Sequence, residues 1–83
     1  MKIYVEVMTP GNGKIYEFQI DSTMTVVQVK ERMIEEITES EKGNITLFPD
    51  KVILSNLSSQ ARLNNTDTIV AAGVRSGHSL MLV

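Results

Sequence analysis

The sequence predicts an α+β roll in which one helix packs on a mixed sheet of four to five strands. Three observations support this prediction. Two segments near the N-terminus alternate apolar and polar residues, the next segment has apolar residues at helical spacing, and the last segment alternates again. With 83 residues the chain has room for one hydrophobic core, so we expect a single domain, residues 1–83.

The N-terminal part of the chain is predicted to form a β-hairpin. Residues 2–8 alternate from Lys2 and Ile3 onward, which is typical of a half-buried strand. Residues 9–13 are Thr-Pro-Gly-Asn-Gly, a composition that favours a turn, and residues 14–21 alternate again. Two alternating runs on either side of a glycine-rich turn indicate a hairpin.

A single amphipathic helix follows the hairpin. Thr25 and Gln28 have the spacing of a capping box, in which each side chain bonds the backbone N–H of the other residue. The charged residues, Lys30 among them, are expected to lie mostly off the apolar stripe, and Gly43 provides a stop. The stripe consists of Val26, Val29, Met33 and Ile37.

The middle of the chain leaves two strand assignments open. Residues 45–48 and 52–55 are apolar and rich in β-forming types, and a Pro-Asp turn separates them. In the first assignment these two segments are the third and fourth strands. In the second, residues 52–55 are the third strand and residues 62–63 the fourth. We prefer the first assignment.

The C-terminal part is predicted to contain a helical turn and a last strand. Thr68 begins the turn and Gly73 ends it, and residues 75–78 form a second turn. Residues 79–83 alternate, with Leu80 and Leu82 directed inward.

Composition excludes several classes of function. The chain is 42% hydrophobic and 22% charged, its net charge is −2, and its lysines and arginines are scattered, so we expect no nucleic-acid partner. It contains no cysteine, which is compatible with a reducing cytoplasm. No stretch has the apolar length of a signal peptide core or a membrane span. We therefore expect a cytoplasmic protein without direct membrane insertion.

No catalytic constellation is found in the sequence. Without cysteine there is no thiol nucleophile, and the single histidine, His78, cannot form a multi-histidine metal site. Gly11 and Gly13 lie between two predicted strands, which is not the context of a phosphate-binding loop. The glutamates of residues 31–41 are expected to form a solvated helix face. We expect no enzyme activity, no cofactor and no metal.

Three segments resemble ubiquitin. These are residues 1–5 (Met-Lys-Ile-Tyr-Val), residues 25–30 (Thr-Val-Val-Gln-Val-Lys) and the turn at residues 68–74, which continues without a gap into the last strand. The resemblance covers nearly the whole chain and implies the ubiquitin-like β-grasp fold. It departs in a longer first turn and in an insertion within about residues 56–67.

The C-terminus differs from that of ubiquitin and its sulfur-carrier relatives. Those proteins use a tail that ends in Gly-Gly, whereas this sequence stops at Leu82 and Val83, so we expect neither conjugation nor sulfur transfer. Residues 73–82 resemble the YukD/EsaB family, which implies a cytoplasmic accessory protein of type VII secretion in a Gram-positive bacterium. A modifier or sulfur carrier whose tail is absent here, or a domain of a larger protein, remains an alternative.

The outer face of the sheet is the expected binding surface, because ubiquitin binds partners through the matching face. Alternation directs Tyr4, Met81 and Val83 outward, with Met8 at the edge of the turn and Leu47 or Phe48 on the third strand. Scattered exposed apolar residues are also normal, so incidental exposure or self-association are the competing interpretations. The oligomeric state is not predicted.

Overall fold

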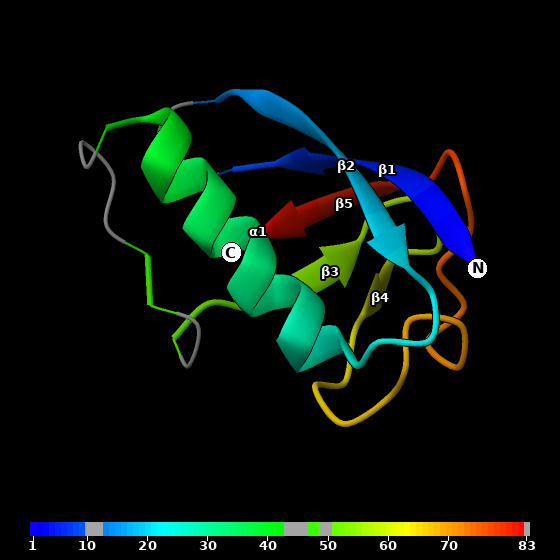
Figure 1. The fold of residues 1–83 in the computed structure, drawn as a ribbon. Coiled ribbons are helices and arrows are strands. Elements are labelled where there is room, and N and C mark those ends of the chain that lie inside the picture. The colour runs from blue at the N-terminus through cyan, green and yellow to red at the C-terminus, as the bar shows by residue number, and fades with distance from the viewer. Residues whose placement is uncertain (10–12, 43–46, 49–50, 83) are drawn as a thin grey trace.

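The computed structural model describes residues 1–9, 13–42, 47–48 and 51–82, and these form one helix and five strands (Figure 1). The elements, in chain order, are β1 (Lys2–Met8), β2 (Ile15–Asp21), α1 (Val26–Ser40), β3 (Leu54–Asn56), β4 (Ala61–Arg62) and β5 (Ser79–Leu82).

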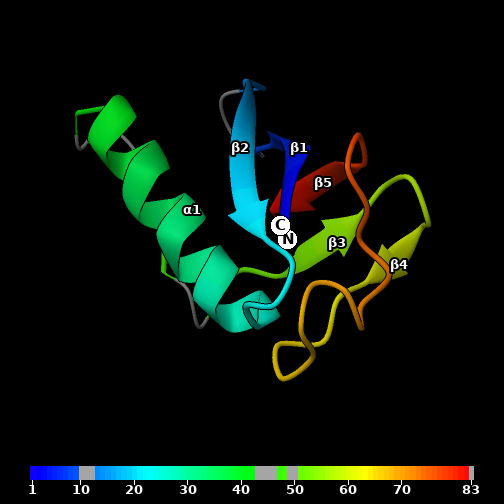
Figure 2. The same cartoon turned by 45° about the vertical axis from the view of Figure 1, so that its right-hand side comes forward.

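The five strands form one mixed sheet in the order β2-β1-β5-β3-β4. The first and last strands, β1 and β5, pair in parallel at the centre, and the other three pairings are antiparallel. Helix α1 crosses one face of this sheet, as Figures 1 and 2 show from two directions. The predicted α+β roll is therefore confirmed.

The N-terminal hairpin forms as predicted. Strands β1 and β2 pair along their whole length, from Lys2 opposite Asp21 to Met8 opposite Ile15. Gly13 has a φ of 66°, a conformation that glycine adopts without steric cost. Residues 10–12 of the predicted turn lie outside the described residues.

The capping box at the start of α1 is also confirmed. The backbone N–H of Gln28 donates to the Thr25 hydroxyl at 3.3 Å, and the backbone N–H of Thr25 donates to the Gln28 side chain at 3.1 Å. The helix ends at Ser40 with Glu41 as its C-cap. The predicted stop at Gly43 lies outside the described residues.

The preferred assignment of the third and fourth strands is wrong. Strand β3 is Leu54–Asn56 and its antiparallel partner β4 is Ala61–Arg62, which corresponds to the second assignment. Leu47 and Phe48 belong to no strand, and residues 45–46 lie outside the described residues. Leu47 packs against the core from an irregular segment, so its apolar character serves burial and not strand pairing.

The buried side chain of Asn56 explains why the β3–β4 turn forms where it does. Its Oδ1 atom accepts hydrogen bonds from the backbone N–H groups of Ser58 and Ser59, at 3.0 and 3.3 Å. An asparagine that bonds the backbone in this way stabilises a tight turn. Gln60 then completes the reversal with a φ of 56°.

The predicted turn before the last strand is confirmed. The Thr68 hydroxyl accepts the backbone N–H of Ala71 at 3.1 Å, and Gly73 and Gly77 have φ values of 80° and 89°. The backbone N–H of Gly77 donates to the carbonyl of Tyr4 at 2.7 Å, which brings the turn against β1.

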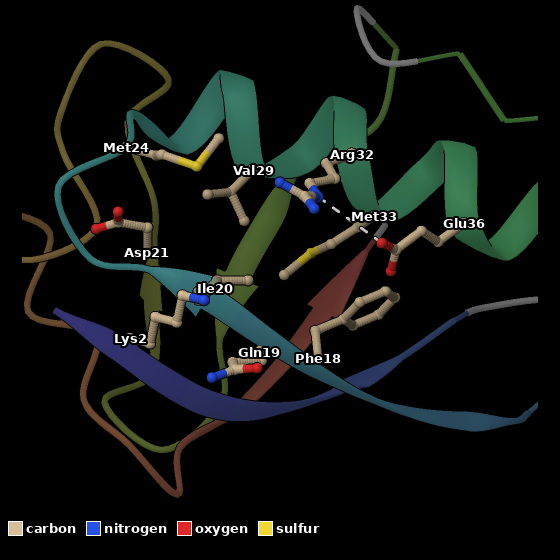
Figure 3. Close-up of a pocket in the computed structure, with 10 residues that line it drawn as sticks. All are labelled: Lys2, Phe18, Gln19, Ile20, Asp21, Met24, Val29, Arg32, Met33 and Glu36. Carbon is tan, nitrogen blue, oxygen red and sulfur yellow. Dashed lines mark ion pairs between the residues drawn. The ribbon is translucent and has the colours of Figure 1, made fainter.

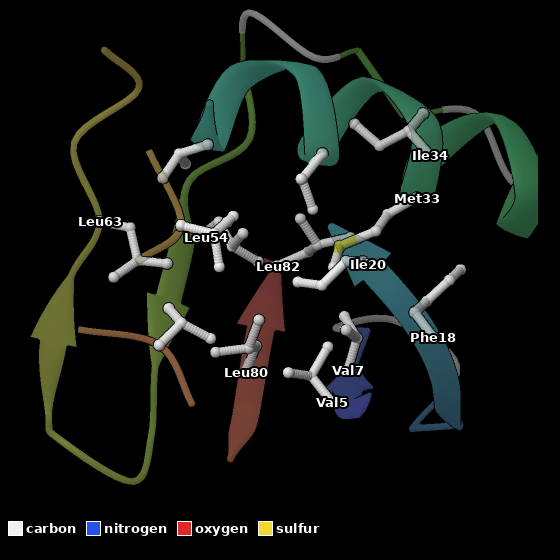
Figure 4. Close-up of a cluster of buried hydrophobic side chains, with 14 of the residues drawn as sticks. Val5, Val7, Phe18, Ile20, Met33, Ile34, Leu54, Leu63, Leu80 and Leu82 are labelled. Carbon is white, nitrogen blue, oxygen red and sulfur yellow. The ribbon is translucent and has the colours of Figure 1, made fainter. Parts of the chain in front are cut away.

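The hydrophobic core lies between α1 and the inner face of the sheet (Figure 4). Every strand except β4 contributes a buried residue, and Ile69 and Val74 from the turn close the end of the core. The buried apolar residues of the strands are Ile3, Val5, Val7, Phe18, Ile20, Leu54, Leu80 and Leu82; the helix adds Val26, Val29, Met33, Ile34 and Ile37.

Lys30 is the exception to the predicted charged face of the helix, because it is only 2% exposed. Its ammonium group donates to the carbonyl oxygen of Val52 at 2.9 Å and to Oδ1 of Asn65 at 3.0 Å. A buried charge is costly unless hydrogen bonds satisfy it. Here the two acceptors come from the segment before β3 and the segment after β4.

We expect Lys30→Ala to lower the free energy of unfolding by about 2–4 kcal/mol, since it removes a packed aliphatic stem and leaves two acceptors without their donor. Lys30→Met retains the stem and should cost less. Urea unfolding followed by circular dichroism measures both, and the exposed Arg32→Met on the same helix is the control. A Lys30→Met domain more stable than wild type would show that the ammonium is a net cost.

Candidate interaction face

The outer face of the sheet carries a continuous row of side chains across all five strands. Residues that alternate with the core positions point to this side. The strand register places these residues next to one another in the order Ile15, Met8, Met81, Ser55 and Arg62. The row is apolar on β2, β1 and β5 and becomes polar on β3 and β4.

Exposure along the row decreases from the edge of the sheet toward its centre. Ile15 is 58% exposed, whereas Met8, Met81 and Ser55 are half-buried. The flexible methionine side chains can adapt to differently shaped partners. Ile15, Met8 and Met81, which are neighbours at one end of the row, therefore form the apolar part of the candidate face.

Tyr4 adds a large, exposed aromatic side chain further along β1. It is 62% exposed and pairs with Gln19 across the hairpin. Its backbone N–H donates to the Ser76 hydroxyl at 3.1 Å, and its carbonyl accepts the N–H of Gly77. The ring therefore projects from a backbone that two hydrogen bonds attach to the turn before β5.

The predicted face residues are only partly brought together. Met8 and Met81 are direct neighbours through the β1–β5 register, and Tyr4 lies on the same face of β1. Leu47, predicted for the third strand, instead packs half-buried against the core. Val83 lies outside the described residues. Ile15 was not among the predicted face residues, although the alternation of residues 14–21 places it outward.

Phe48, the alternative to Leu47, is exposed but belongs to no strand. It is 55% exposed, and the ammonium of Lys51 lies 5.8 Å from the centre of its ring. This distance is within the range of a cation–π contact.

The apolar end of the row is held by a contact between β2 and the end of α1. The Tyr16 hydroxyl donates to Oε1 of Glu41, and the Lys14 ammonium lies 2.9 and 3.1 Å from the two carboxylate oxygens. These contacts flank Ile15 on both sides. The hydrogen bond from Tyr16 lowers the pKa of the Glu41 carboxyl, and that from Lys14 lowers it further. Glu41 in turn raises the pKa of Lys14.

Two carboxylates face each other next to this row. Glu6 on β1 and Glu17 on β2 are opposite residues in the register, and both are exposed. Ser22 donates to the carbonyl of Met1 and Thr9 to that of Lys14, so the hydrogen-bonded pairs are the odd-numbered residues of β1. Glu6 and Glu17 are therefore a non-hydrogen-bonded pair, whose side chains approach most closely.

His78 has a structural environment. Its Nδ1 atom accepts the backbone N–H of Arg75 at 3.2 Å, and the Asn56 amide nitrogen lies 3.0 Å from the same atom. Because Nδ1 accepts from Arg75, the network assigns Asn56 as a second donor. His78 thus fixes the turn to β3. Within the described part of the chain, no group of three or more acidic, histidine or cysteine residues is arranged to hold a metal ion, and no helix has the length and apolarity to cross a membrane.

Comparison with solved structures identifies the fold. The chain is similar to the ubiquitin of Caldiarchaeum subterraneum, with 22% identity over 99% of this chain and 91% of the other and a TM-score of 0.70. The ubiquitin-like domain of Plasmodium falciparum Dsk2 gives 18% identity over the full length of both chains, with a TM-score of 0.73. That of PLXNC1 gives 13% identity over 100% and 98%, with a TM-score of 0.82.

The domain therefore has the ubiquitin-like β-grasp fold, one helix on a five-stranded mixed sheet, as the sequence predicts. No family model and no curated protein sequence matches the chain.

Replacing Glu41 tests the contact that holds the apolar end of the row. The pKa of Glu41 is lower in the folded state than its unfolded value, so its contribution to stability is present above the unfolded pKa and is lost as the pH falls through the folded pKa. We expect the unfolding free energy of Glu41→Gln to fall less than that of wild type between about pH 5 and pH 3.

Urea titrations at a series of pH values measure this slope. Glu39→Gln removes an exposed glutamate from the last turn of α1 and is the control, which should retain the wild-type slope. An identical slope in Glu41→Gln would contradict the role of the Tyr16–Glu41 contact in solution.

Replacing Glu17 tests the carboxylate pair. Glu17→Lys converts a like-charge pair into an opposite-charge pair with Glu6, so we expect the unfolding free energy to rise by about 0.5–1 kcal/mol at low salt. Gln19→Lys, which places the same new charge opposite Tyr4, is the matched control and should give a smaller gain. The gain should diminish in 1 M salt, where the pair is screened. A Glu17→Lys domain that gains no more stability than Gln19→Lys would contradict a repulsion between Glu6 and Glu17.

Proposed function

We propose that this domain is a protein-interaction module, acting without catalysis and without a cofactor, and that it serves as a cytoplasmic accessory of type VII secretion. The partner is bound non-covalently by the outer face of the sheet. The observation that carries this proposal is the row formed by Ile15, Met8 and Met81; the exposed ring of Tyr4 lies on the same face of β1, with Glu6 between it and Met8.

The chemistry of this face favours a protein partner. Aromatic and methionine side chains are enriched at protein interfaces, where their large, adaptable surfaces are buried. Tyr4 offers both an apolar ring and a hydroxyl for hydrogen bonding. Glu6 and Glu17 lie between the apolar row and Tyr4, so a partner with a basic residue between two apolar contacts fits best.

The type VII assignment is supported by the resemblance of residues 73–82 to the YukD/EsaB family. In the structure, Gly73 and Gly77 take positive φ values on either side of a tight turn, and the turn leads directly into β5. Leu80 and Leu82 of that strand are buried, while Met81 between them faces outward. These features are also compatible with other ubiquitin-like domains, so the partner decides the assignment.

The proposal is tested by affinity purification of the tagged chain from a Gram-positive bacterium that encodes a type VII system. We expect recovery of a component of that system, identified by mass spectrometry. Tyr4→Lys combined with Met81→Lys should reduce recovery at least about tenfold, because two charges must then be desolvated at the centre of the interface.

Two further measurements give this experiment its controls. The double variant must retain the wild-type urea midpoint, since Tyr4 is exposed and Met81 only half-buried. Val70→Lys, a substitution at an equally exposed residue in the turn before β5, should leave recovery unchanged. Recovery of unrelated proteins alone would contradict the type VII assignment, and a covalent adduct that survives denaturing electrophoresis would favour a modifier or carrier.

A further inference from the structure

A small hollow lies on the outer face of the sheet, between the exposed ring of Tyr4 and the facing residues Glu6 and Glu17. Its volume is about 250 Å³, below the roughly 300–1,000 Å³ of sites for drug-sized ligands, so it fits a single side chain. The side chain of Val5 is buried in the core, so its backbone forms the floor of the hollow. Gly77, in the turn before β5, completes the lining.

Gly77 leaves the hollow open beside Tyr4. Its backbone N–H donates to the carbonyl of Tyr4 at 2.7 Å, so the two residues are neighbours where the turn meets β1. Its φ of 89° is one that glycine adopts without steric cost. In the described part of the chain, a Cβ on Gly77 would point into open space, with no non-neighbouring atom within 4 Å. A ligand can therefore approach the ring of Tyr4 from this side.

The lining of the hollow is negatively charged. Among the described residues that form it, Glu6 and Glu17 are acidic and none is basic, and neither glutamate takes part in an ion pair with a described residue. The two are a non-hydrogen-bonded pair, so their side chains approach closely and repel each other. A cation placed between them replaces this repulsion with two attractions.

The groove between β2 and α1 on the other side of the sheet does not select for charge (Figure 3). Lys2 and Arg32 line it together with Asp21 and Glu36, so its basic and acidic residues balance. Figure 3 shows the ion pair of Arg32 and Glu36, whose charged groups are 3.7 Å apart. Charge recognition next to β2 therefore belongs to the outer hollow and not to this groove.

We propose that the outer hollow binds one arginine side chain of the protein partner, an inference that rests on the proposed function of the outer face. The guanidinium stacks on the ring of Tyr4 and donates hydrogen bonds to Glu6 and Glu17. Its planar fork has five N–H donors and can bond both carboxylates at once, whereas the ammonium of lysine is a compact point charge. Arginine is also the cation found more often over aromatic rings.

The strand spacing defines the partner segment further. Along β1, Tyr4, Glu6 and Met8 point outward two residues apart, so aromatic, acidic and apolar surfaces follow one another at intervals of about 6.5 Å. The alternate side chains of an extended segment have the same spacing. A segment with an apolar residue two positions from the arginine therefore contacts Met8 and Met81 while the arginine occupies the hollow.

The experiment uses the full chain labelled with ¹⁵N and a blocked five-residue peptide, Leu-Ser-Arg-Ser-Leu. We expect saturable shifts of the backbone amides of Glu6, Glu17 and Gly77, with a dissociation constant of about 1 mM or below. Citrulline in place of arginine has nearly the same shape without the charge and should weaken binding at least about tenfold, and lysine at least about threefold. Equal binding of the citrulline or lysine peptide, or no saturable binding of the arginine peptide, would overturn the proposal.

Variants separate the hollow from general charge attraction. Glu17→Gln removes one carboxylate, relieves the repulsion in the free domain and should weaken binding of the arginine peptide at least about fivefold. Glu31→Gln combined with Glu35→Gln removes two exposed carboxylates from α1 and should leave binding unchanged. An equal loss in the helix variant would overturn the proposal.

Replacing Tyr4 tests the stacking. Tyr4→Leu retains an apolar side chain but removes the aromatic face, so the preference for arginine over lysine should decrease. The variant should retain the wild-type urea midpoint, because Tyr4 is exposed. An unchanged preference for arginine would overturn the role of the ring.

These measurements distinguish the inference from the proposed function. Binding of the arginine peptide without recovery of a type VII component would support the hollow and contradict the secretion assignment. Recovery that depends on Tyr4 and Met81, with no peptide binding and no effect of Glu17→Gln, would overturn the inference alone. Sedimentation of the chain by itself should give a monomer. A dimer that Arg62→Gln dissociates would show that a second copy supplies the arginine, and would overturn its assignment to a partner.

Discussion

One buried ammonium group ties the segments that flank β3 and β4 to helix α1. Between the end of α1 and the start of β5, those two strands supply only five of the residues. Lys30 reaches from the helix to Val52 before β3 and to Asn65 after β4. A buried charge is costly without hydrogen bonds, so Val52 and Asn65 must both place an oxygen atom next to the Lys30 ammonium. The lysine thereby fixes the chain before β3 and after β4 relative to α1, while pairing with β5 holds β3 in the sheet.

Local signals made the first half of the chain predictable, and their absence explains the error in the middle. Alternation and the capping box of Thr25 are properties of neighbouring residues, so the hairpin and the helix follow from the sequence. The choice between the two β-rich segments as the third strand does not follow from such local signals. It was decided by pairing with β5, where Leu54 lies opposite Leu82, and by the turn that Asn56 stabilises. Both are tertiary or side-chain effects that outweigh β propensity.

The candidate face was predictable to the extent that it depends on alternation alone. The outward direction of Tyr4, Met8 and Met81 follows from alternation along β1 and β5, two strands that the sequence predicts correctly. Leu47 was misplaced because its assignment rested on the wrong third strand. The opposition of Glu6 and Glu17 depends on the exact register of β1 and β2. That register is set by how many residues the turn takes up, which alternation alone does not determine.

The distribution of polarity across the sheet places the apolar part of its outer face toward β2. Ser55 and Arg62 make the β3–β4 end of the outer row polar, so the apolar surface is displaced to Met81, Met8 and Ile15. The outward backbone groups of Ile15 and Glu17 lie at the end of that displaced surface. Main-chain hydrogen bonds do not depend on side-chain type, so discrimination between partners at this end of the sheet would come from the apolar row and not from the strand edge.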